Sequence, residues 1–172
     1  MSVKNRKTEM EKYINHFDQN TDKLLKTIKD YPIEKLNAKN SSEWSVLEIL
    51  EHIYITDQVI YSIVSKHSDI ESKTTEIVGR DKLETILVDQ RNKKLQTPEL
   101  LKPKGHFKNL TDFSSAFSTL RNTIKSDLTT EKIRFDNRIH NHFILGEMTI
   151  TDWFNFMLFH TKRHLQQIEE SK

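Results

Sequence analysis

The sequence contains no cysteine, and this absence excludes disulfide bonds, thiolate metal ligands and cysteine nucleophiles together. Any chemistry must therefore use histidine, carboxylate or hydroxyl side chains, or a cofactor. Glycine and proline are also scarce, with three of each. The chain has no glycine-rich phosphate loop and little of the turn chemistry that hairpin-joined strands require, which favours long helices.

Neither sign of charge dominates, because 27 basic residues are interleaved with 25 acidic ones and the formal net charge is +2. This excess is too small to indicate binding to nucleic acid or to an anionic membrane. No apolar run approaches the roughly 18 residues of a membrane span, and the first residues lack the apolar region of a secretion signal. We therefore expect a cytoplasmic protein, with a single domain over residues 1–172.

Apolar residues recur at alternating steps of three and four, which predicts amphipathic helices. Four long helices are expected over residues 10–28, 45–67, 111–128 and 150–171. Ser45 and Glu48 form a capping box at the start of the second helix. The third helix is expected to bury Phe113, Phe117, Leu120, Ile124 and Leu128.

Two shorter stretches separate these helices. A helical segment is expected over residues 82–96, between the second and third long helices, and residues 133–146 are expected to form a long loop. Tyr31-Pro32 ends the first helix because the residue before proline disfavours the helical region. The pattern predicts an all-α fold, a four-helix bundle with one short extra helix.

Histidines on the second and last helices suggest a metal site. His160 and His164 are four residues apart and project from one helical face, with His164 inside the apolar stripe. His52 lies at the flank of the second helix's apolar surface, where a buried imidazole needs a hydrogen bond or a metal ion. The three would form a metal site, or they are hydrogen-bonded core residues. His140 and His142 are rival ligands.

Three polar residues lie within a turn or so of these histidines. Glu48, one turn before His52, is a candidate hydrogen-bond acceptor or base, although the capping box explains it equally well. Asp57 and Gln167 are better candidates for hydrogen-bonding the ligands. Other nearby residues are interpreted as structural, with core packing for Trp44 and Trp153 and a solvated charge for Arg163.

Two segments resemble a known family. WSVLEILEHIYITDQ, residues 44–58, and GEMTITDWFNFMLFHTKRHLQQI, residues 146–168, are similar to the signature segments of the DinB/YfiT-like superfamily. The resemblance covers nearly the whole chain in order and spacing. It implies an up-down-down-up four-helix bundle in which His52, His160 and His164 hold one divalent ion, zinc or nickel before others. It also implies that a homodimer is an available state.

The resemblance supports the metal more directly than the reaction. Some members of the family are thiol-dependent transferases or isomerases, and others have been called hydrolases. Three neutral imidazoles leave a coordination position open, where water or a substrate thiol can ionise. We therefore expect a metal-dependent enzyme that acts on a small molecule. Transfer of a low-molecular-weight thiol, bound as a cosubstrate, is favoured over hydrolysis. The alternatives are a non-catalytic metal-binding or stress-related bundle protein and a metal-free helical interaction protein.

Overall fold

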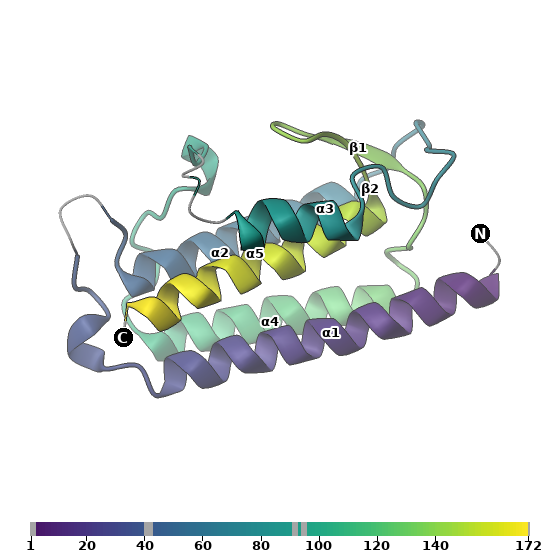
Figure 1. Cartoon of the computed structure of the whole chain (residues 1–172). Coiled ribbons are helices and arrows are strands. Elements are labelled where there is room, and N and C mark those ends of the chain that lie inside the picture. The colour runs from purple at the N-terminus through teal and green to yellow at the C-terminus, as the bar shows by residue number, and fades with distance from the viewer. Residues whose placement is uncertain (1–2, 40–42, 91–92, 94–95, 172) are drawn as a thin grey trace.

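Four long helices dominate the computed structural model, which describes residues 3–39, 43–90, 93 and 96–171. They are α1 (Val3–Lys29), α2 (Val46–Val64), α4 (Leu110–Thr129) and α5 (Ile150–Glu170) (Figure 1). Helix α1 contacts α4 and α5, and α2 contacts the same two helices. Helices α1 and α5 run in one direction, and α2 and α4 run in the other (Figure 1). The predominantly helical fold is confirmed.

Capping boxes start the two helices that carry the candidate histidines. The Ser45 hydroxyl accepts a hydrogen bond from the Glu48 backbone N–H at 3.3 Å, and Glu48 accepts one from the Ser45 N–H at 2.9 Å. Thr149 and Asp152 repeat the arrangement at the start of α5. Each box pairs donors that a helix N-terminus otherwise leaves free, so both helices begin at defined positions.

A β-hairpin precedes α5, so the prediction of a long loop over residues 133–146 was wrong. Strand β1 (Ile139–His142) pairs antiparallel with β2 (Gly146–Thr149), from Ile139 opposite Thr149 to His142 opposite Gly146. Gly146 has a φ of 73°, a backbone conformation that side-chain-bearing residues rarely adopt. Each strand has four residues, which are too few for an alternation of polar and apolar residues to be recognised in the sequence.

The segment between α2 and α4 differs from the expected helix over residues 82–96. Helix α3 (Arg80–Glu84) passes into a π-helical turn, η2 (Thr85–Asp89), and residues 91–92 and 94–95 lie outside the described part of the chain. The Arg163 guanidinium donates to the backbone carbonyls of Leu87, at 3.1 Å, and Lys93, at 3.2 Å. Arg163 therefore ties this segment to α5, and its interpretation as a solvated charge was wrong. The described residues also form two 3-10 turns, η1 (Ile33–Lys35) and η3 (Glu99–Leu101).

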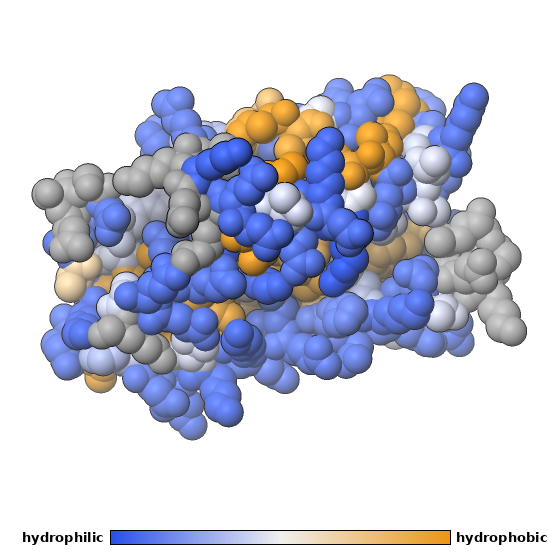
Figure 2. Space-filling view, in the orientation of Figure 1, coloured by the Kyte–Doolittle hydropathy of each residue, from blue (hydrophilic) through white to orange (hydrophobic). Residues whose placement is uncertain are grey.

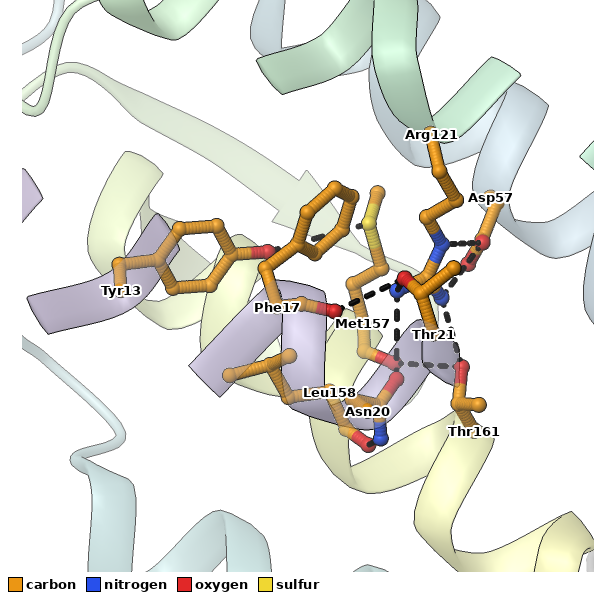
Figure 3. A network of polar contacts seen from close by, with 9 residues as sticks. All are labelled: Tyr13, Phe17, Asn20, Thr21, Asp57, Arg121, Met157, Leu158 and Thr161. Atoms are coloured by element: carbon orange, nitrogen blue, oxygen red, sulfur yellow. Dashed lines mark hydrogen bonds and ion pairs between the residues drawn. The ribbon is translucent and has the colours of Figure 1, made fainter. Parts of the chain in front are cut away.

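A buried arginine links the four long helices (Figure 3). Arg121 on α4 is 2% exposed and donates to the Asp57 carboxylate on α2 at 2.7 Å. Its other nitrogens donate to Thr161 on α5 at 2.8 Å and to Asn20 on α1 at 3.2 Å. Because a buried charge is costly unless it is paired and hydrogen-bonded, these contacts fix the relative positions of the helices.

This network changes two expectations from the sequence. Arg121 takes a fully buried position on α4, whereas Leu120 is partly buried against the core. The Arg121 guanidinium carbon lies 4.4 Å and 4.7 Å from the ring centres of Phe17 and Phe117. Asp57 pairs with Arg121 and contacts none of the described histidines. None of the helices in the described ranges is both long enough and apolar enough to cross a membrane.

Candidate metal centre

His52 on α2 meets His160 and His164 on α5 in the core of the molecule. Their ligating nitrogens all lie within 4.8 Å of one another, and His52 Nε2 is 3.0 Å from His160 Nε2. The ring centres are 4.9, 4.9 and 4.6 Å apart. Each side chain is nearly buried. The structure thus brings together the three histidines that the sequence singled out.

Hydrogen bonds fix how two of these rings are protonated. His52 Nδ1 donates to the Leu101 carbonyl at 2.8 Å, and His164 Nδ1 donates to the Gln167 side-chain oxygen at 2.9 Å. In the neutral rings, Nε2 then carries a lone pair on the side away from these acceptors. His160 Nδ1 is buried with no hydrogen-bond partner in the described part of the chain. The Nε2 lone pairs of His52 and His164, together with the adjacent His160 ring, are suited to holding a cation.

Burial keeps the three imidazoles neutral. It lowers the pKa of His52 and takes the pKa of His160 well below its ordinary value. Burial, with the neighbouring His52, lowers the pKa of His164 to about 3. Removing a charged imidazolium from water is unfavourable, and a second one nearby adds repulsion. At neutral pH the rings therefore present lone pairs, as metal binding requires.

Glu51 holds the loop that follows Leu101, the hydrogen-bond acceptor of His52. Its buried carboxylate accepts hydrogen bonds from the backbone N–H groups of Lys104, Gly105 and His106 at 2.8 to 3.0 Å. Leu101, whose carbonyl faces His52, lies just before this loop. Glu51 was not recognised from the sequence, although its position next to apolar Leu50 and near Ile53 could have indicated a buried carboxylate.

The other candidates near the histidines have distinct roles. Gln167 accepts from His164, as expected of a residue that orients a ligand. Glu48 contacts Ser45 and Lys39 and does not line the cavity described below. The Trp44 ring lies 4.9 Å from the His52 ring, so this residue contacts the site as well as packing.

Hairpin residues His140 and His142 lie outside the three-histidine group. His140 is on β1, where its backbone carbonyl accepts a hydrogen bond from the buried Trp153 indole at 3.2 Å. His142 lies at the end of the same strand, next to the cavity. Of the two rival ligands, His142 is therefore the one placed to contact a bound molecule.

A cavity of about 330 Å³ adjoins the three histidines. Its walls come from α2, η2, η3, the hairpin and α5, and they are mostly apolar, including Ile60, Ile63, Leu87, Leu100, Phe143 and Phe156. Among the described lining residues there is no aspartate or glutamate. Phe143 and Leu100 are 63% and 65% exposed, and Figure 2 shows apolar residues gathered on the upper part of the face in view. The dimensions suit a small organic molecule.

The match to a family model settles the relationship of this chain to known proteins. The model of the DinB superfamily matches residues 16–168, a range that contains all three histidines and the hairpin. The chain belongs to the DinB superfamily. This DinB-superfamily protein is 28% identical over 146 residues to the uncharacterized protein YuaE of Bacillus subtilis (strain 168), across 81% of this chain and 84% of the relative. No solved structure gives a significant match.

Proposed function

We propose that this DinB-superfamily protein is a metal-dependent enzyme that transfers a low-molecular-weight thiol to a small electrophile. The observation that carries the proposal is the convergence of three neutral imidazoles beside an apolar cavity. His52, His160 and His164 would hold one divalent ion per chain, with zinc or nickel favoured by the imidazole ligands. The fold that presents them is inferred to be an up-down-down-up bundle forming one domain over residues 1–172.

The residues present fit such an ion. The set contains three nitrogen ligands and no carboxylate or thiolate, which leaves a position free for a substrate. A thiol bound at the open position of such an ion ionises near neutral pH. The Leu101 carbonyl and Gln167 keep His52 and His164 in the orientation that ligation requires. The apolar walls limit water around the reacting groups and contact the electrophile.

The cavity lining favours thiol transfer over hydrolysis. Zinc hydrolases of the HExxH type use the glutamate of that motif as general base, and no described carboxylate lines this cavity. Glu48, the candidate base, is engaged with Ser45 and Lys39. An ionised thiol is itself the nucleophile and needs no such base. Because the chain has no cysteine, the thiol must arrive as a cosubstrate.

The second candidate function is a non-catalytic metal protein. It is supported by the origin of the histidines, since His52 comes from α2 and His160 and His164 come from α5. An ion held by these residues would cross-link two helices that already contact each other. Binding of an ion to the folded state alone stabilises that state.

The proposal is tested by assaying the zinc- and nickel-loaded protein with bacillithiol, glutathione or cysteine and monochlorobimane. Formation of the fluorescent conjugate should exceed the rate given by the His164→Ala protein. Elemental analysis of the same samples reports whether each carries the ion, independently of turnover. A metal-loaded protein that is no faster than His164→Ala with every thiol would overturn the transferase proposal and favour the non-catalytic alternative.

A further inference from the structure

His142 occupies a defined place between the hairpin and the histidine cluster. It is 8% exposed, and its ring lies 4.5 Å from Phe143, 5.3 Å from Trp153 and 4.9 Å from Phe156. Phe156 in turn stacks on His160 at 5.8 Å. A continuous set of rings therefore connects His142 to the candidate metal centre along one wall of the cavity.

The hairpin turn fixes the protonation of His142. Its Nδ1 accepts hydrogen bonds from the backbone N–H groups of Ile144 and Leu145, both at 3.1 Å. A nitrogen that accepts two N–H groups carries a lone pair and no proton, so the proton of the neutral ring is on Nε2. Burial also lowers the pKa of His142 to about 4, which keeps the ring neutral at pH 7.

The Nε2–H group of His142 has no acceptor in the described part of the chain. Nδ1 faces the turn, and the side chain lines the cavity that also borders His52, His160 and His164. Nε2 is not fully buried, so its N–H group is accessible from the cavity. An unpaired donor at a cavity wall is therefore a site for an acceptor on a bound molecule.

The surrounding walls define what such a molecule is. Apart from the histidines, Arg163 is the charged side chain among the described lining residues, and its guanidinium already donates to the Leu87 and Lys93 carbonyls. A charged group would lose its hydration against mostly apolar walls, and the described lining residues offer a cation no carboxylate to pair with. A neutral, mostly apolar molecule with one acceptor avoids this cost.

We propose that the cavity binds a neutral apolar carbonyl compound whose oxygen accepts a hydrogen bond from His142 Nε2. The proposal rests on the proposed function: the thiol sulfur would form a bond to the carbonyl carbon, the C=O π bond would break, and the carbonyl oxygen would take up the proton that the thiol releases, giving a hemithioacetal. His142 then positions the carbonyl group beside the three-histidine centre. The apolar walls contact the rest of the molecule.

The test compares two probes of the same shape, acetylnaphthalene, which has a carbonyl oxygen, and isopropenylnaphthalene, which has none. Their dissociation constants are measured by calorimetry with the full chain, both metal-loaded and after chelation. In His142→Asn, the amide oxygen can replace Nδ1 as the acceptor for the turn, while the Nε2 donor is lost. His140→Asn is the matched control, because His140 is on the same strand but does not line the cavity.

The wild-type protein and His140→Asn should bind the ketone about three- to tenfold more tightly than the hydrocarbon, the preference expected for one hydrogen bond. His142→Asn should bind the two probes equally, with the hydrocarbon affinity unchanged. No preference in the wild type, a preference retained in His142→Asn, or an equal loss of both probes in that variant would each overturn the proposal. Because the preference is also measured on chelated protein, its failure is distinct from a failure of thiol transfer.

Discussion

His52 Nε2 lies 3.0 Å from His160 Nε2, although the two residues are 108 positions apart in the chain. The His52 ring donates through Nδ1 to Leu101, so its Nε2 faces His160 with a lone pair. In the absence of a cation, this arrangement requires His160 to donate its proton across the contact. A bound cation instead satisfies both nitrogens, and with them His164.

Replacing any one of the three histidines should abolish stable metal binding. We expect His52→Ala, His160→Ala and His164→Ala each to weaken the affinity for the metal ion by more than about 100-fold. Loss of a residue that only hydrogen-bonds a ligand weakens metal binding by about 10- to 100-fold, and loss of the ligand itself should cost more. Elemental analysis of untagged protein purified without chelator measures the ion content. His67→Ala is the control, because its side chain is 82% exposed and pairs with Asp69. Unchanged metal content in all three variants would contradict the assignment.

Gln167 should affect the metal without being a ligand. Gln167→Ala removes the acceptor for His164 Nδ1, and we expect about 10- to 100-fold weaker metal binding. Gln167→Glu keeps an acceptor oxygen and should restore the affinity. A competition titration with a chromophoric chelator measures the constants. If Gln167→Ala matched the wild type while His164→Ala did not, the orientation of His164 would have to come from the ring's packing alone.

The buried Asp57–Arg121 pair should act on stability and not on the metal. Asp57→Ala leaves the Arg121 guanidinium buried without its counter-charge, and we expect a loss of about 3–5 kcal/mol in the free energy of unfolding. Denaturant titration of metal-free protein measures it. Glu9→Ala, which breaks the exposed ion pair with Lys12, should leave the midpoint unchanged. Loss of the ion from folded Asp57→Ala would show instead that Asp57 acts at the metal centre.

The stability of the metal-free protein should fall as the pH falls from about 6.5 to about 4. The pKa of His142 is lowered from 6.5 to about 4, so the unfolded chain binds a proton in this window that the folded state does not. The pKa of Asp57, raised from 3.8 to about 6 by its burial, acts in the opposite direction. His164, with its pKa lowered to about 3, reinforces the effect of His142.

Unfolding titrations at a series of pH values measure this dependence. His142→Asn should have a shallower slope than the wild type between pH 6.5 and 4, by close to one proton. If the slope of stability against pH is the same in His142→Asn as in the wild type, His142 takes up its proton in the folded protein as easily as in the unfolded chain.

Most of the fold could be predicted from the helical periodicity of the sequence. The long helices and the Ser45–Glu48 capping box were predictable because local spacing and local hydrogen bonds decide them. The hairpin was not, since β1 reads Ile-His-Asn-His and is defined by its pairing with β2. Register and pairing depend on a partner strand that no single segment specifies.

The site was predictable to the extent that it follows helical spacing. His160 and His164 share a face by their separation, and the inward position of His52 followed from its neighbours. The partner of Asp57 was not predicted, because Arg121 was not recognised as a buried residue of α4. Arg121 nevertheless lies four residues after Phe117 and three before Ile124, which places it on the same helical face as these two buried residues. Pairing between distant charges becomes visible only when the helices are packed.

Strand β2 passes into α5 with no residue between them, since one ends at Thr149 and the other begins at Ile150. Changes in chain length therefore have unequal effects along the hairpin. Residues 143–145, in the turn, can be lengthened to reshape the cavity mouth while the paired strands stay in place. A single inserted residue within β1 instead shifts the pairing by one and turns His142 to the opposite face of the hairpin. Insertions that keep His142 in the cavity must therefore lie in the turn or add residues to the strand in pairs.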